Sequence, residues 1–144
     1  MLVHASCVSI DDQGVLIRGP SGCGKSDLAL RLIDGGGRLI ADDQVELAVE
    51  NGHLVARCPA PILGLMEIRH VGLLAAPHTR HARLYLILDP ATASAPLPRL
   101  PEAATTTIFG VDVPALSLPY FEASTAAKIR LILQQSKLTR KSAG

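Results

Sequence analysis

One glycine-rich octet constrains the fold of this chain more than any other feature of the sequence. It consists of Gly19, Pro20, Ser21, Gly22, Cys23, Gly24, Lys25 and Ser26. The octet fits the pattern G-x-x-x-x-G-K-[ST] at every fixed position. The mainly apolar run 15–18 before it favours a short strand, and residues 27–34 after it carry apolar side chains near helical spacing. A loop that joins a buried strand to a helix is the context that this pattern requires, so the sequence predicts an α/β fold.

The octet has the chemistry of a phosphate-binding loop. Glycines let successive backbone N–H groups converge on phosphate oxygens, and the start of the following helix adds a favourable dipole. Lys25 is expected to reach the β and γ oxygens of ATP, and the Ser26 hydroxyl is expected to bind Mg²⁺. Cys23 stands at a position where the pattern accepts any residue. We expect only its backbone to take part in the loop, and a reactive thiol is the alternative. The whole octet is therefore the predicted ATP-binding segment, and a chance glycine turn is the alternative.

Strand and turn signals dominate the rest of the sequence. Strands are expected at 3–10, 15–18, 38–41, 45–49, 53–58, 84–89, 105–109 and 115–118, and helices at 27–34 and about 125–137. Asn51-Gly52, between two of these strands, is the strongest short hairpin signal in the chain. Because strands and hairpins outnumber helices, we expect a mixed sheet rich in antiparallel hairpins with few helices.

The length of 144 residues suits one core. We expect a single domain over residues 1–136 and a basic flexible tail over 137–144. Residues 77–83 are expected to form a loop, as is the Pro- and Ala-rich stretch 91–103, whose length is typical of functional or disordered segments.

Composition weighs against several classes of function. The net charge of +1 gives no broad field for steering toward nucleic acid or a membrane, and the lack of Trp gives few surfaces for stacking on single strands. Cys7, Cys23 and Cys58 form no C-x-x-C pair, which argues against a disulfide framework and a zinc site. The first residues lack the features of a signal peptide. We therefore expect a cytoplasmic protein without nucleic-acid or membrane partners.

Adjacent carboxylates follow the predicted strand 38–41. Successive side chains of a strand point to opposite faces, so we expect one of Asp42 and Asp43 to face the phosphates and the other to face away. A carboxylate beside the loop is suited to accept a proton from an incoming hydroxyl or to help hold Mg²⁺. A turn-forming pair of acids is the alternative.

Three further residues are candidates for the site. Asp89 ends the apolar run 84–89 like the acid of a Walker B strand, although a strand that stops at a turn has the same pattern. Glu67 lies in an apolar stretch, where an acid is costly unless it is functional or paired, and Arg69 is the candidate partner. Arg99 in the loop 91–103 is suited to clamp phosphate, with a solvated side chain as the alternative.

Residues 3–47 and 65–74 resemble HPr kinase/phosphorylase, the bacterial family that phosphorylates a serine of the phosphocarrier HPr. The resemblance rests on a histidine upstream of the octet, the octet itself, the run R-L-I-A-D-D and the segment E-I-R-x-V-G. It implies a P-loop domain of the phosphoenolpyruvate-carboxykinase-like type. It also implies ATP and Mg²⁺ as cofactors and HPr as the partner, and it leaves a homo-oligomer open.

The resemblance implies a role for individual residues. Lys25 and the octet would hold ATP, Ser26 and Glu67 would bind Mg²⁺, and Asp42 is a further candidate ligand. Asp43 would be the proton acceptor from the substrate serine.

The remaining catalytic positions follow from the same resemblance. His4 falls on the catalytic histidine of the family, and Arg99 falls provisionally on its catalytic arginine, so the expected catalytic set is His4, Lys25, Asp43 and Arg99. Asp89 falls on an acid that has no metal role in the family.

This chain departs from the family pattern in two respects. This sequence does not include the N-terminal domain usual in the family, so we expect it to resemble the short alphaproteobacterial versions. Residues 121–124 stand where full-length members carry a basic segment tied to dephosphorylation. We therefore expect kinase activity with weak or absent phosphorylase activity.

Other functions remain open from the sequence. The octet also resembles the loops of guanylate kinases and of ABC-transporter ATPases, which favours a small-molecule kinase or a transport ATPase as alternatives. A non-catalytic ATP sensor in a phosphotransfer or two-component system is a further alternative. The retained Asp43, Glu67 and His4 favour chemistry over sensing.

Overall fold

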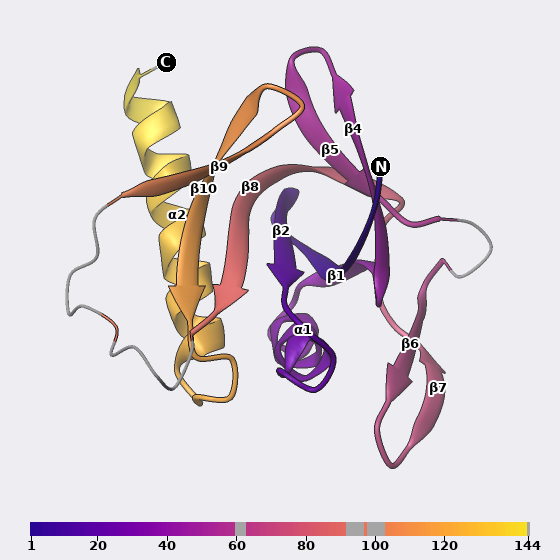
Figure 1. Cartoon of the computed structure of the whole chain (residues 1–144). Helices are drawn as coiled ribbons and strands as arrows, with labels where there is room; N and C mark the ends of the chain where they lie inside the picture. Colours follow the sequence, from indigo (N-terminus) through magenta and orange to yellow (C-terminus); the bar gives the residue numbers. More distant parts are fainter. Residues whose placement is uncertain (60–62, 92–96, 98–102, 144) are drawn as a thin grey trace.

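The computed structural model describes residues 1–59, 63–91, 97 and 103–143. In chain order its elements are β1 (Leu2–Ile10), β2 (Gln13–Arg18), α1 (Lys25–Asp34), β3 (Arg38–Ala41), β4 (Gln44–Glu50), β5 (His53–Arg57), β6 (Leu65–Ile68), β7 (Gly72–Ala75), β8 (His81–Pro90), β9 (Ala104–Ile108), β10 (Val111–Leu118) and α2 (Thr125–Ala143). The expectation of a strand-rich α/β fold with few helices is confirmed (Figure 1).

The strands of the main sheet form a path that closes on itself. Its order is β2-β1-β4-β5-β8-β10-β9, with β3 added beside β1 and an additional pairing of β2 with β8. The pairs β2–β8 and β8–β10 are parallel, whereas β1–β2, β4–β5 and β9–β10 are antiparallel hairpin pairs. The carboxyl ends of β2, β8 and β10 therefore lie at one edge of the sheet, and the glycine-rich octet begins at this edge.

Alternation along the central strands separates the apolar side chains into two clusters. Val15 and Ile17 of β2 belong to a cluster that also contains buried residues of α1 and α2, whereas Leu16 belongs to a cluster with residues of β4 and β5. Successive side chains of a strand point to opposite faces, so β2 is buried on both sides. Strand β2 thus lies between the helices on one side and the β4–β5 hairpin of the same sheet on the other (Figure 1).

The strongest local signals of the sequence have the expected structure. Asn51 and Gly52 have φ angles of 52° and 77°, as the predicted two-residue hairpin turn between β4 and β5 requires. Helix α1 buries Leu28, Ala29 and Leu32 against the sheet. It ends at Asp34, directly before the run of glycines at 35–37.

Other parts of the chain differ from expectation. The apolar stretch around Glu67 forms the β6–β7 hairpin, which projects beside α1 (Figure 1). Strand β8 begins at His81, inside the expected loop 77–83, because its first residues pair with β5. Helix α2 continues past the expected end near residue 137 to Ala143. No helix in the described part of the chain is both long enough and apolar enough to cross a membrane.

Candidate active site

The glycine-rich octet forms a tight loop between β2 and α1. Gly19, Gly22 and Gly24 have φ angles of 139°, 86° and 102°, which residues with a Cβ rarely adopt. The buried Lys25 begins α1, and its Nζ donates hydrogen bonds of 2.6 and 3.0 Å to the carbonyl oxygens of Gly19 and Pro20. Its ammonium group therefore lies within the curve of the loop, where the expected phosphate contacts require it.

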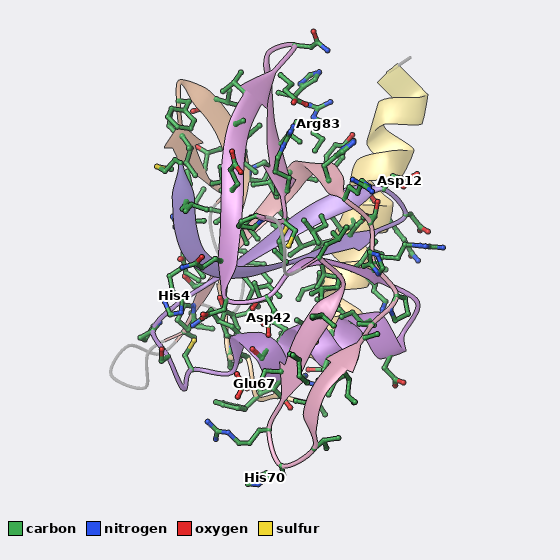
Figure 2. All side chains as sticks on the ribbon, turned by 90° about the vertical axis from the view of Figure 1, so that its right-hand side faces the viewer. His4, Asp12, Asp42, Glu67, His70 and Arg83 are labelled. Carbon is green, nitrogen blue, oxygen red and sulfur yellow. The ribbon has the colours of Figure 1, made fainter. Side chains whose placement is uncertain are left out.

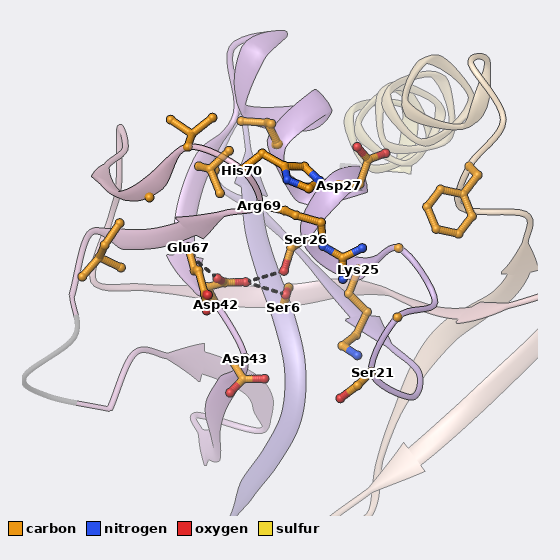
Figure 3. A pocket seen from close by; sticks show the side chains of 18 of the residues that line it. Ser6, Ser21, Lys25, Ser26, Asp27, Asp42, Asp43, Glu67, Arg69 and His70 are labelled. Carbon is orange, nitrogen blue, oxygen red and sulfur yellow. Dashed lines mark hydrogen bonds between the residues drawn. The ribbon is translucent and has the colours of Figure 1, made fainter.

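Asp42 joins three segments of the chain at the loop. Its Oδ1 accepts hydrogen bonds from the hydroxyl of Ser26 at 3.0 Å and from the hydroxyl of Ser6 at 3.1 Å. Its Oδ2 accepts a longer bond of 3.4 Å from the backbone N–H of Glu67. Figure 3 shows these contacts in the pocket, with Lys25 on the other side of Ser26. The last residue of the octet, β1 and the β6–β7 hairpin thus meet at one carboxylate.

Asp43 has a different partner from its neighbour. Its Oδ1 lies 2.7 Å from Nε2 of His4, and the side chains of His4 and Asp43 are 49% and 74% exposed. Asp43 has a φ of 71°, and its backbone oxygen accepts a 3.1 Å hydrogen bond from the N–H of Ala5. The carboxylate is accessible to a ligand, and a single histidine contact orients it.

The expectation that only one of these acids faces the loop is wrong. It assumed that strand geometry continues through both residues, but β3 ends at Ala41 and Asp43 adopts a left-handed conformation. As a result Asp42 and Asp43 line the same pocket.

Glu67 reaches the site from the β6–β7 hairpin. Figure 2 shows Glu67 close to Asp42, with His70 at the tip of the hairpin. Glu67 and Arg69 both line the pocket, but the ion pairs among the described residues do not include a Glu67–Arg69 pair. The pairing alternative for Glu67 is therefore not favoured.

A pocket of about 1080 Å³ contains most of the predicted site residues. Its lining includes His4, Lys25, Ser26, Asp42, Asp43 and Glu67. The volume lies at the upper end of the range for small-molecule sites. The structure thus brings together predicted site residues that are up to 63 positions apart in the sequence, from His4 to Glu67. Arg99 lies outside the described residues.

Sequence reasoning did not assign several lining residues to this pocket, and Ser6 and Phe121 are two of them. Ser6 lines it and shares Asp42 with Ser26. It stands two positions after His4 in β1, and this spacing, which places both side chains on one face of a strand, is a signal that could have found it. Phe121, which precedes α2, also lines the pocket, and no local pattern indicates this.

Asp89 has a separate environment. Its carboxylate accepts two hydrogen bonds of 2.9 Å from Nε and Nη2 of Arg18, the residue directly before the octet. The bond to Asp89 raises the pKa of Arg18 above its usual value. Asp89 is not among the residues that line the pocket, so the alternative in which it holds Mg²⁺ is not favoured.

The oxygen donors beside the loop suit a magnesium ion. Mg²⁺ is usually bound by one or two carboxylates together with substrate phosphates and water. The Ser26 hydroxyl and the carboxylates of Asp42 and Glu67 supply such donors within one pocket. Among the described residues, no group of three or more His, Cys, Asp and Glu side chains is close enough to hold a metal ion by itself. The donor set therefore fits Mg²⁺ that is shared with a phosphate ligand.

Known proteins of one family are similar to this chain. The family described as the HPr Serine kinase C-terminal domain matches residues 1–142. An HPr kinase/phosphorylase of Limosilactobacillus reuteri is 35% identical over 147 aligned positions, which cover 94% of this chain and 45% of the relative. The HPr kinase/phosphorylase of Geobacillus sp. is 42% identical over 95 positions, 60% of this chain and 30% of the relative. This chain therefore spans less than half the length of these curated relatives.

A solved structure is similar over nearly the whole chain. The Hpr(Ser) kinase/phosphatase from Coxiella burnetii superposes with a TM-score of 0.85 at 28% sequence identity, covering 99% of this chain and 94% of that chain. The agreement extends to the strand-rich architecture described above.

Proposed function

The chain belongs to the HPr Serine kinase C-terminal domain family, and from this premise we propose that it is an ATP- and Mg²⁺-dependent protein kinase that phosphorylates a serine of HPr. The observation that carries this proposal is the shared pocket of the phosphate loop, Asp42 and the Asp43–His4 pair. It combines an anion-binding loop with the exposed carboxylate of Asp43, which are the parts that phosphoryl transfer to a hydroxyl requires.

The loop from Gly19 to Ser26 is the proposed ATP site. Its backbone N–H groups and the start of α1 would hold the phosphates. The Nζ of Lys25 now contacts carbonyl oxygens of the loop and would exchange them for the β and γ oxygens of ATP. Such contacts would place the γ-phosphoryl group in the pocket that Asp42 and Asp43 line.

Ser26, Asp42 and Glu67 are the proposed Mg²⁺-holding residues. When bound, Mg²⁺ would neutralise the negative charge that develops on the phosphates during transfer. Ser6 holds the carboxylate of Asp42 through a 3.1 Å hydrogen bond, which orients it toward Ser26. Mutation of such orienting partners typically weakens metal binding.

Asp43 is the proposed proton acceptor. The substrate serine oxygen bonds to the γ-phosphorus while the bond from that phosphorus to the β–γ bridging oxygen breaks, and the hydroxyl proton passes to the Asp43 carboxylate. Nε2 of His4 holds this carboxylate at 2.7 Å. Arg99 is proposed from the family resemblance as a further catalytic residue that neutralises charge on the transferred group.

The direction of the reaction is a further part of the proposal. By the family resemblance, residues 121–124 stand at the basic segment of full-length members that is tied to dephosphorylation, and here they carry an acid and small residues beside Phe121. Because these four residues include neither Arg nor Lys, the segment offers no side-chain cation for phosphoserine. We expect the kinase reaction to dominate, with weak or absent phosphorylase activity.

The proposal extends to the type of P-loop fold, the cellular location, the domain bounds, the partner and the oligomeric state. The parallel strands β2, β8 and β10 inside a sheet rich in antiparallel pairs support a phosphoenolpyruvate-carboxykinase-like domain. Four further points stay predictions: a cytoplasmic location, a single domain over residues 1–136, HPr as the partner and a homo-oligomer.

Incubation with γ-labelled ATP, Mg²⁺ and HPr tests the proposed function. Label is expected on a serine of HPr, and an HPr in which this serine is replaced by alanine is the control. ATP hydrolysis without labelled HPr would contradict the assignment of HPr as the substrate.

A further inference from the structure

Phe121 is an exposed aromatic side chain at the edge of the active-site pocket. It is 69% exposed, although a large apolar side chain gains free energy by burial. Its ring contacts the phosphate loop, because a Cβ atom at Gly24 would lie only 2.9 Å from Cζ of Phe121. Of the Phe and Tyr residues in the chain, all of them described, Phe121 is the one that lines the pocket.

The backbone around Phe121 is fixed to both elements that flank the loop. The hydroxyl of Tyr120 donates a 2.7 Å hydrogen bond to the carbonyl oxygen of Arg18, the last residue of β2. Arg31 of α1 donates through Nη1 to the carbonyl oxygen of Glu122 at 2.9 Å and through Nη2 to the carbonyl oxygen of Tyr120. These bonds hold the residues on each side of Phe121, so the ring has a defined position while its face remains accessible.

Arg31 is itself oriented within α1. Its Nε donates a 3.1 Å hydrogen bond to the carboxylate of Asp27, one turn earlier. Asp27 lines the pocket next to Ser26. The tether of Phe121 is thus connected through Asp27 to the first turn of α1, which would hold the phosphates.

Phe121 lies near the edge of the sheet at which a ligand of the loop is expected to bind. In α/β sheets, ligands bind outside the carboxyl ends of parallel strands. Strand β2 ends at this edge with the phosphate loop, and β10, which is parallel to β8 and through it to β2, ends there at Leu118. A nucleotide with its phosphates on the loop would extend from the loop along this edge, where the ring of Phe121 lies against Gly24.

We propose that Phe121 is a stacking platform for the base of ATP. The inference rests on the proposed ATP site for the identity of the ligand, and it assigns a binding residue outside the proposed catalytic set. Stacking uses the π-face that every base presents, so it adds affinity without selecting one purine. A ring that only shields Gly24 from solvent is the competing role, and it would affect all ligands of the loop alike.

Binding of ATP and of tripolyphosphate to the Phe121→Ala variant separates the two roles. Tripolyphosphate occupies the loop but has no base. Calorimetry in the presence of Mg²⁺ is expected to show a loss of ATP affinity of roughly 5- to 100-fold and no change for tripolyphosphate. Phe109→Ala is the matched control, since Phe109 is 56% exposed but lies in the β9–β10 turn, and it should leave both affinities unchanged.

A single-tryptophan variant gives a second readout of the same contact. The chain contains no Trp, so Phe121→Trp introduces its sole tryptophan. ATP is expected to quench this fluorescence, and tripolyphosphate is expected to leave it unchanged. Quenching by both ligands, equal affinity losses in Phe121→Ala, or no loss at all would overturn the stacking role. Failure of the wild type to bind either ligand would overturn the ATP site as well, whereas ATP binding without transfer to HPr would contradict only the proposed substrate.

Discussion

The hydroxyl of Ser26 donates a hydrogen bond of 3.0 Å to the carboxylate of Asp42. This bond links the last residue of the phosphate loop to the first residue after β3. The same carboxylate oxygen accepts the hydroxyl of Ser6 at 3.1 Å. Both hydroxyls donate to Asp42, so its orientation is set from β1 and from the start of α1. The proposed Mg²⁺ site depends on this orientation of the Asp42 carboxylate.

Asp42→Asn should weaken the response to Mg²⁺. The amide keeps the size of the side chain but removes its charge, so the Mg²⁺ concentration for half-maximal activity should rise by roughly 10- to 100-fold. Magnesium titration of phosphoryl transfer measures this shift. Asp34→Asn, which alters an exposed acid at the end of α1, should leave the titration unchanged. An unchanged midpoint in Asp42→Asn would remove this residue from the metal site.

Lys25→Ala should lose most of the affinity for ATP. The Nζ of Lys25 lies among the carbonyl oxygens of the loop, where it is placed to contact phosphate. A charge-assisted hydrogen bond contributes about 1.5–3 kcal/mol, so a loss of roughly 10- to 100-fold is expected. Calorimetric titration with ATP measures it. Equal affinities of the variant and the wild type would mean that the octet does not hold the phosphates in the proposed way.

Asp89→Asn should lower the free energy of unfolding but leave the Mg²⁺ concentration for half-maximal activity unchanged. Both oxygens of Asp89 accept hydrogen bonds from Arg18, and the side chains are 38% and 34% exposed. Since solvent screens a partly exposed pair, the loss of unfolding free energy should be about 1 kcal/mol. Urea unfolding gives this value. A shift of the Mg²⁺ midpoint as large as that in Asp42→Asn would instead support a Walker B role for Asp89.

Tyr120→Phe should alter the pH dependence of stability. Burial raises the pKa of Tyr120 above its usual value, so the phenol ionises more readily in the unfolded chain. The folded state loses stability as the pH rises above about 10, the usual tyrosine pKa.

Near neutral pH the variant should be less stable by about 1 kcal/mol, because it lacks the hydrogen bond to the Arg18 carbonyl oxygen. Above about pH 10 this difference should shrink and then reverse, since only the wild type can ionise at this position. Urea unfolding at pH values on either side of about 10 measures the trend. A difference that is independent of pH would contradict the buried, protonated phenol.

Local sequence signals accounted for much of the fold. The octet requires a strand before it and a helix after it, and β2 and α1 provide them. Asn51-Gly52 specified the β4–β5 turn because both residues tolerate positive φ angles. The β6–β7 hairpin was missed because its turn contains His70 at a φ of 70°, a residue that carries no strong turn signal.

The arrangement of the site depends on contacts that local patterns do not carry. Asp42 and Asp43 enter one pocket because the chain leaves strand geometry at Ala41, which the alternation rule could not anticipate. Phe121 reaches the loop through hydrogen bonds of Tyr120 and Arg31 to residues about a hundred positions away, with separations of 102 and 91 residues. Such long-range contacts join β2 and α1 to the segment between β10 and α2, and no single segment of the sequence indicates them.

Transfer of label from γ-labelled ATP to HPr by the wild type and by Asp43→Asn shows whether this chain is a kinase that uses Asp43 as its proton acceptor. ATP affinity, measured in parallel, should be similar in both proteins, because Asp43 contacts His4 rather than the loop. With the wild type, we expect labelled serine on HPr. In the variant, transfer should fall by about 100-fold or more, as expected when a general base is removed. Equal labelling by both proteins would contradict the role of Asp43, and tight ATP binding without labelled HPr in either would contradict the kinase assignment.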